Sequence, residues 1–114
     1  MKTKPIMKTA ALSILLLTLY GVRTRAADAG ELWEKNCASC HGKDGRGDTK
    51  MGKKVNVKDY TDPKFQAEFK DDKAAKTIKE GITENGKERM KPFAEKLTDD
   101  DIKALIAHIR TFKK

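Results

Sequence analysis

The chain has few of the residues that build most metal and catalytic sites. Of its 114 residues only two are cysteine and two are histidine, and 6% are aromatic. A zinc site that used Cys37 and Cys40 would need a second Cys or His pair, and the sequence has none. A thioredoxin-like redox motif needs a strand-helix-strand context, which the sequence does not indicate. A simple disulfide between the two cysteines stays open as an alternative.

The chain also lacks an apolar stretch long enough to span a membrane. Residues 10–20 form an apolar run of eleven residues, whereas a membrane-spanning helix needs about 20. Three lysines precede this run, and the small residues Thr24 and Ala26 stand at the positions that favour cleavage after Ala26, which is the pattern of a secretory signal peptide. We therefore predict a signal peptide over residues 1–26 and a mature domain over residues 27–114. An uncleaved N-terminal anchor is the alternative.

The excess of positive charge belongs partly to this leader. The formal charge is +8 at pH 7, and removal of residues 1–26 takes away five basic and no acidic residues, which leaves +3. So small a charge, without a recognisable binding motif, argues against a nucleic-acid-binding protein. The remaining domain has few aromatic residues and therefore a small apolar core. A buried cofactor would supply the missing apolar surface.

One short pattern near the start of the predicted mature domain is specific. The run Cys37-Ala38-Ser39-Cys40-His41 is a C-x-x-C-H sequence, the attachment signature of c-type haem. Two thiols three positions apart lie on one side of a helical turn, where each can form a thioether to a haem vinyl group. The histidine that follows is then held beneath the iron as a proximal ligand. Cys37 and Cys40 are therefore candidate cofactor-binding residues, and His41 is a candidate metal ligand.

The rest of the chain predicts helices joined by loops. Capping residues, a proline and acidic residues mark four helix starts: after Asp28, at Asp62-Pro63, after Asp71-Asp72 for a helix over residues 73–80, and at Thr98. The last of these helices carries one apolar stripe, formed by Ile102, Leu105, Ile106 and Ile109. Gly30 lies inside the first helix and suggests a helix crossing there.

Residues 42–60 are rich in glycine and lysine and are predicted to form a surface loop around the haem. No segment shows a strand pattern. The expected fold class is therefore all-α, with three to four helices and loops.

A single histidine ligand would leave the opposite side of the iron open. Methionine is the usual partner in electron-carrying c-type haems, and the mature domain contains Met51 and Met90. Met90 lies just ahead of the last helix, where Pro92 and Phe93 can stiffen the chain. Met51 lies in the predicted surface loop. Met90 is the candidate second metal ligand, and Met51 is the alternative.

With these motifs the sequence resembles the small monohaem class I cytochromes c of bacteria. The similarity covers residues 28–114 and is carried by Cys37-Ala-Ser-Cys-His-Gly42, Ile78-Lys-Glu-Gly-Ile82, Met90-Lys-Pro-Phe93 and residues 97–110. It implies a cytochrome c fold around one covalent haem c, with thioethers at Cys37 and Cys40. It also implies His41 and Met90 as iron ligands, and a periplasmic location.

The sequence departs from this family at two positions. Similar proteins often have a proline after the haem motif whose carbonyl accepts the proton on Nδ1 of the proximal histidine, but residues 51–55 contain none. The acceptor for His41 is therefore undetermined. His108 stands where similar chains have tyrosine, and we expect it to pack near Trp33 rather than bind iron.

With both axial positions filled, the iron has no vacant site for a substrate, so we expect an electron carrier and not an enzyme. Basic residues in the loops that border the haem would favour an acidic patch on a redox partner; they are Lys43, Lys50, Lys53, Lys54, Lys87, Arg89 and Lys91. We expect a monomer. The alternative is a ligand-binding or peroxidase-like haem protein in which Met90 is not bound to the iron.

Overall fold

The computed structural model describes residues 2–3 and 28–114, which contain six helices and one two-stranded sheet. The elements are α1 (Ala29–Asn36), α2 (Ala38–His41), α3 (Lys50–Val55), α4 (Pro63–Glu68), α5 (Asp71–Glu80), β1 (Ile82–Glu84), β2 (Lys87–Met90) and α6 (Asp99–Arg110). Apart from residues 2–3, the predicted signal peptide lies outside the described residues. In the part that is described, no helix has the length and apolar character needed to cross a membrane.

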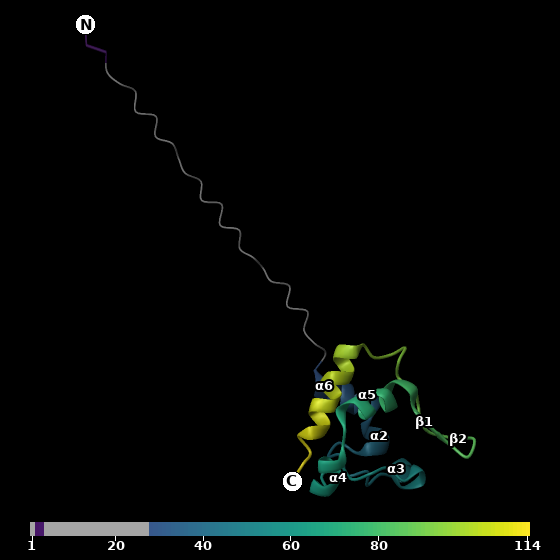
Figure 1. Ribbon diagram of the computed structural model, residues 1–114. Coiled ribbons are helices and arrows are strands. Elements are labelled where there is room, and N and C mark those ends of the chain that lie inside the picture. The colour runs from purple at the N-terminus through teal and green to yellow at the C-terminus, as the bar shows by residue number, and fades with distance from the viewer. Residues whose placement is uncertain (1, 4–27) are drawn as a thin grey trace.

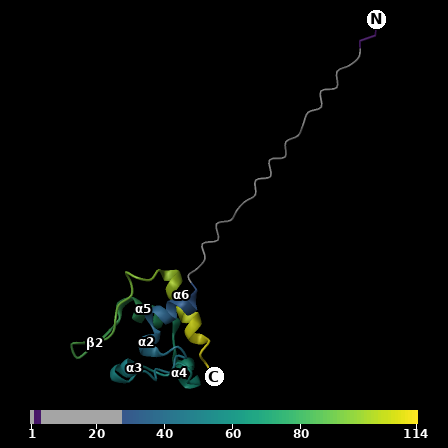
Figure 2. The same ribbon diagram turned by 180° about the vertical axis from the view of Figure 1, so that it is seen from behind.

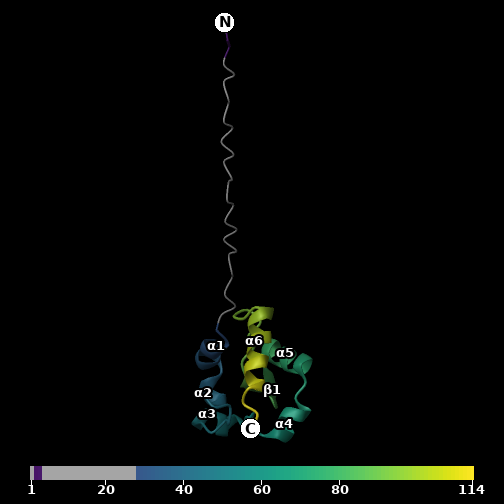
Figure 3. The same cartoon turned by 90° about the vertical axis from the view of Figure 1, so that its left-hand side faces the viewer.

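Helix α6 forms the centre of the packing. Its start is a capping box: the Thr98 hydroxyl accepts from the Asp101 amide at 3.1 Å, and the Asp101 carboxylate accepts from the Thr98 amide at 3.0 Å. The predicted apolar stripe of α6 is buried throughout. Helices α1 and α5 both contact α6, and α6 runs between the α1–α3 side and the α4–α5 side of the domain (Figure 3).

Trp33 of α1 is buried in the hydrophobic core. Its indole Nε1 donates to the Gly42 carbonyl at 2.9 Å. The centroid of the His108 ring lies 5.6 Å from that of the Trp33 ring, which confirms that His108 packs near Trp33.

The helix crossing expected at Gly30 is not found there. Among the described residues, a Cβ at Gly30 would meet only the Asp28 carboxylate, at 3.3 Å, and no atom of another helix. Gly30 does not mark the crossing of α1 and α6.

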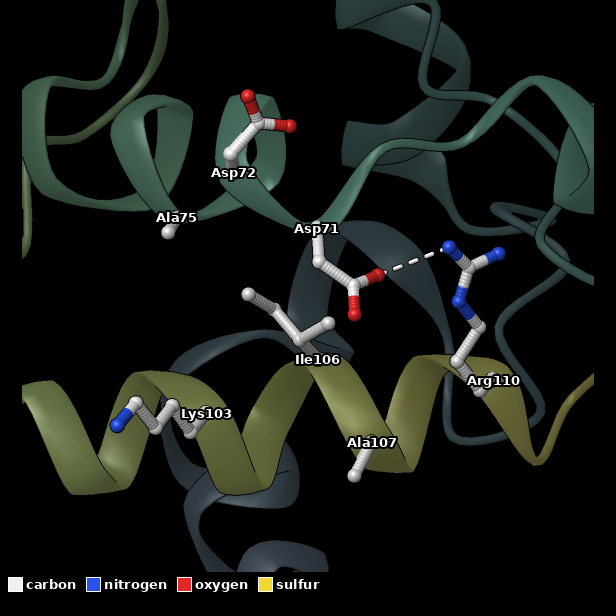
Figure 4. A pocket seen from close by; sticks show the side chains of 7 residues that line it. All are labelled: Asp71, Asp72, Ala75, Lys103, Ile106, Ala107 and Arg110. Atoms are coloured by element: carbon white, nitrogen blue, oxygen red, sulfur yellow. Dashed lines mark hydrogen bonds and ion pairs between the residues drawn. The ribbon is translucent and has the colours of Figure 1, made fainter.

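Helices α4 and α5 are joined to α6 by Arg110. Its guanidinium donates to the Gln66 carbonyl and to the Phe69 carbonyl, each at 2.6 Å. It also donates to the Asp71 carboxylate at 2.8 Å (Figure 4). Pro63 occupies the first turn of α4, as predicted. Asp71, however, lies inside the first turn of α5 rather than before the helix. In that turn its negative charge still interacts favourably with the helix dipole.

The prediction that no strand would form is wrong. Strands β1 and β2 pair antiparallel and project from the helices as a hairpin (Figures 1 and 2). The turn is Asn85-Gly86, and both residues have positive φ, 51° and 74°. That conformation matches a two-residue hairpin turn, for which Asn-Gly is a strong signal. The strands are short and mostly exposed, so they lack the apolar alternation that would have indicated them.

The stretch 42–60 is not entirely loop, since it contains α3. Thr49 caps this helix by accepting from the Gly52 amide at 2.8 Å, and its hydroxyl donates to the Cys40 carbonyl at 2.7 Å. The helix ends at Asn56, which is left-handed with φ of 58°. Thr49 thereby fixes α3 against the end of α2.

Candidate functional site

Cys37, Cys40 and His41 are brought together by the short helix α2. The Cys37 amide donates to the Trp33 carbonyl at 2.8 Å, so this residue ends α1 as it begins α2. The Cys40 and His41 amides both donate to the Cys37 carbonyl, at 3.2 Å and 2.9 Å. Both cysteines are half-buried and their sulfurs are not joined in a disulfide. The single helical turn expected from the spacing is therefore present.

The Cys37 thiol does not have the character of a redox nucleophile. Burial, with a smaller contribution from neighbouring Cys40, raises the pKa of the Cys37 thiol to about 11. Reactive cysteines in thiol-disulfide enzymes have a lowered pKa instead, because the thiolate is the nucleophile. This argues against a redox-active thiol pair.

His41 has the properties of a metal-ligating imidazole. Burial lowers its pKa to about 4, so the ring is neutral at pH 7, the form that binds a metal. Its Nδ1 atom is buried and has no hydrogen-bond partner in the part of the chain that the structure describes. The Tyr60 ring stacks on it, with centroids 5.0 Å apart and planes 16° apart. Two unjoined thiols and a neutral imidazole on one turn are the donor set that covalent haem requires.

Met90 is the last residue of β2 and is half-buried against the hydrophobic core. The backbone at Met90 and just after it is fixed by contacts with α5 and the residue that follows it. Gly81 lies against the Met90 carbonyl, and the amide of buried Phe93 donates to the Ile78 carbonyl at 2.9 Å. Met51, by contrast, is 46% exposed on α3. Of the two methionines considered, only Met90 is held against the core.

The segment that carries Met90 is supported separately from the segment that carries His41. Helix α2 has its main contacts with α1 and α3, and β2 has its main contacts with β1.

Tyr60 was not singled out from the sequence, although its ring lies beside His41. The only available signal was an aromatic residue just before Asp62-Pro63, and that does not specify a contact with His41.

Two surface hollows lie outside this group of residues. A groove of about 600 Å³ lies between α5 and α6 and is lined by Asp71, Asp72, Ala75, Lys103, Ile106, Ala107 and Arg110 (Figure 4). A smaller hollow of about 290 Å³ lies beside Trp33 and His108. Within residues 2–3 and 28–114, no three His, Cys, Asp or Glu side chains form a group that could hold a metal ion. The further ligands that a zinc site at Cys37 and Cys40 would need are not assembled there.

Comparison with known proteins identifies the family. A family model described as "Cytochrome C oxidase, cbb3-type, subunit III" matches residues 24–109. A solved structure titled "KustC0563 c-type cytochrome" is 35% identical, with a TM-score of 0.67, and the match covers 76% of this chain and 99% of that one. A Tyr-to-Phe mutant of that protein is 36% identical, with a TM-score of 0.67 and coverage of 75% and 99%. The comparison with curated proteins gives no match.

These findings confirm the predicted all-α cytochrome c fold, here with six helices and a hairpin in the described residues. Members of this class carry covalently bound haem c, exchange electrons through its iron, and act together with redox partners. The chain therefore belongs to the c-type cytochromes, as a small monohaem protein of the family described as cytochrome c oxidase, cbb3-type, subunit III.

Proposed function

We propose that this cytochrome is a periplasmic electron carrier in which His41 and Met90 bind the haem iron and Cys37 and Cys40 form the thioethers. The contrast between the two methionines carries the proposal. Met90 packs against the core in a segment fixed by backbone contacts, whereas Met51 is 46% exposed. When bound, haem supplies reversible one-electron exchange between Fe(II) and Fe(III).

The protein side chains set the conditions for that exchange. His41 is neutral at pH 7, because burial lowers its pKa to about 4, and it can therefore donate a ring nitrogen to the iron without first losing a proton. Trp33 fixes the residue after His41 through its hydrogen bond to the Gly42 carbonyl. The soft thioether of Met90 favours the reduced iron and raises the potential.

If His41 and Met90 both hold the iron, no position would be left on the metal for a substrate. We therefore propose a carrier rather than an enzyme. The aromatic rings around His41 limit the access of water, because Trp33 is 2% exposed and Tyr60 is packed against Phe65 at a centroid distance of 5.1 Å.

The basic residues near the haem motif support docking on an acidic partner surface. Lys43 and Lys53 are exposed, and their ion pairs with Glu34 at 3.5 Å and Asp48 at 2.9 Å lie at the surface. Such exposed pairs are weak, so both lysines remain available to a partner. We propose a monomer that docks through this charge, with association rates that fall as salt rises.

The proposed location follows from the sequence of the leader. Residues 1–26 carry the pattern of an export signal, and attachment of haem to C-x-x-C-H in bacteria of this class takes place in the periplasm. We propose residues 27–114 as the mature domain. An anchored carrier on the same side of the membrane is the alternative.

Optical spectra of the purified protein, oxidised and reduced, test the proposed ligation. We expect a six-coordinate low-spin spectrum, a weak Met-to-iron band at the red end in the oxidised state, and slow binding of cyanide. A high-spin spectrum with fast cyanide binding would mean an open sixth position. That result would favour the ligand-binding or peroxidase-like alternative.

A further inference from the structure

The orientation of the His41 ring is not fixed by a hydrogen bond to its Nδ1 atom from the described residues. A histidine bound to a metal through one nitrogen almost always donates its other N–H to an acceptor, which fixes the orientation of the ring. In this structure the Nδ1 atom of His41 is buried and has no hydrogen-bond partner within residues 2–3 and 28–114. The sequence also lacks a proline in residues 51–55. The restraint must come from another contact.

Tyr60 makes that contact. Its ring stacks on the imidazole with planes only 16° apart and centroids 5.0 Å apart, within the range of offset aromatic stacking. The other aromatic neighbour of His41, Trp33, lies farther away at 5.6 Å and is tilted by 42°. A ligand held by one ring nitrogen keeps a single rotation, about the bond to the metal. A nearly parallel ring on one face opposes that rotation, and a tilted ring opposes it less.

Tyr60 can act as a fixed surface because its own backbone is held on both sides. Its backbone amide donates to the Gly45 carbonyl at 2.8 Å, and its carbonyl accepts from the side-chain Nε2 of Gln66 at 2.6 Å. Gln66 is buried and the same nitrogen donates to the Ile109 carbonyl in α6 at 2.9 Å. Tyr60 is thereby connected to Gly45, to α4 and to α6.

The Tyr60 ring is also enclosed by other aromatic rings. Phe65 lies 5.1 Å from it and Phe69 lies 6.1 Å from it, centroid to centroid. Phe69 is in turn covered by the guanidinium of Arg110 at 4.6 Å. The ring that faces His41 therefore cannot turn away without displacing these neighbours.

We propose that Tyr60 is a positioning residue that sets the plane of the His41 imidazole by stacking. This inference rests on the proposed function, since it assumes that His41 binds the iron. The aromatic ring of Tyr60 has this positioning role, and its hydroxyl has none. The orientation of an axial imidazole controls how unpaired spin spreads over an oxidised haem, so it is visible in the spread of the haem methyl resonances in proton NMR.

Three variants of the haem-loaded protein separate this role from general packing. Tyr60→Leu removes the stacked plane, and we expect the order and spread of the haem methyl resonances to change and the reduction potential to shift. Tyr60→Phe keeps the ring, and we expect it to retain the wild-type pattern. Phe112→Leu removes an aromatic ring of the same core whose ring contacts are with Trp33 and His108, and it should also keep that pattern. A wild-type pattern in Tyr60→Leu, or the same change in Phe112→Leu, would overturn the inference.

A measurement on the unmutated protein covers the case in which Tyr60→Leu does not fold. In the reduced, diamagnetic state we expect nuclear Overhauser contacts between the ring protons of Tyr60 and His41, and their absence would overturn the inference. The same sample reports separately on the proposed ligation. If the wild type shows the low-spin spectrum and the Met-to-iron band but fails the Tyr60 tests, only the stacking role is wrong. If it lacks that spectrum, the ligation is wrong and the inference fails with it.

Discussion

Gly81 lies against the carbonyl oxygen of Met90, so closely that a Cβ at Gly81 would collide with it. Gly81 ends α5 with φ of 72° and ψ of −172°, a conformation that is essentially restricted to glycine. The end of helix α5 and the residue proposed to bind iron are therefore in direct backbone contact. A side chain at Gly81 must move the Met90 segment.

The first prediction tests this contact. Gly81→Ala should lower the free energy of unfolding by about 2–3 kcal/mol, from backbone strain and from the collision, and should weaken the Met-to-iron band. Denaturant unfolding and the oxidised optical spectrum measure the two effects. Gly86→Ala is the control, because Gly86 also has positive φ, 74°, but no atom of the described residues lies within 4 Å of its Cβ position. It should cost about 1 kcal/mol and leave the band intact. Equal effects on the band would show that the Gly81 contact does not position Met90.

A second pair of glycines tests the packing of α3 on α2. A Cβ at Gly52 would collide with the Cys40 carbonyl and approach the Gly47 carbonyl to 2.5 Å. We expect Gly52→Ala to destabilise the protein by about 1–3 kcal/mol, because an extra carbon forces backbone shifts. Thermal or denaturant unfolding measures the change.

Gly30 is the matched helical control for Gly52. Its Cβ position faces only the Asp28 carboxylate, at 3.3 Å, and alanine is a better helix former than glycine by about 1 kcal/mol. Gly30→Ala should therefore leave stability unchanged or raise it by up to about that amount. If Gly52→Ala is tolerated as well as Gly30→Ala, α3 is not packed on α2 as described.

The third prediction concerns the dependence of folding on covalent haem. A cofactor that binds only the folded state stabilises that state, and the apolar core of this small domain is limited. The double variant Cys37→Ser, Cys40→Ser should thus lose most of its helicity in circular dichroism. Ser39→Ala, an exposed position between the two cysteines, should retain haem and helicity. Native-like helicity in the double variant would show that the core is sufficient without the covalent links.

The fourth prediction concerns export. If residues 1–26 are a signal peptide, intact-mass analysis of the protein from the periplasmic fraction should give a chain that starts at Ala27 and carries one haem. A mass that retains Met1, together with recovery in the membrane fraction, would support the anchored alternative instead.

The helical part of the fold could be predicted from local sequence signals. The capping box at Thr98, the proline at the start of α4 and the apolar stripe of α6 each depend on neighbouring residues, and each is present in the structure. The hairpin could not be found from periodicity, because its strands are mostly exposed. Its one reliable signal was the Asn85-Gly86 dipeptide.

The attachment motif could also be predicted, since Cys37, Cys40 and His41 lie within five residues. What surrounds His41 could not. The backbone of Tyr60, whose ring stacks on His41, is held by the side chain of Gln66, which also donates to the Ile109 carbonyl, 43 residues after Gln66. Contacts of that kind come from tertiary packing, and no local pattern indicates them. The same holds for Gly81, whose contact with Met90 follows from the path of the hairpin.

The fifth prediction compares the two methionines. Met90→Ala removes a soft donor that favours Fe(II), so the reduction potential should fall by on the order of 0.1 V, part of the roughly 0.8 V that axial ligands span. The vacated position should admit cyanide quickly. Met51→Ala is the matched control, because it removes the same side chain from an exposed position, and neither property should change much.

The oxidised optical spectrum of these two variants tests the central claim most directly. If His41 and Met90 bind the iron, the weak Met-to-iron band at the red end is lost in Met90→Ala and kept in Met51→Ala. The reverse pattern would assign the ligand to Met51, and a band kept in both variants would show that neither methionine acts alone as proposed.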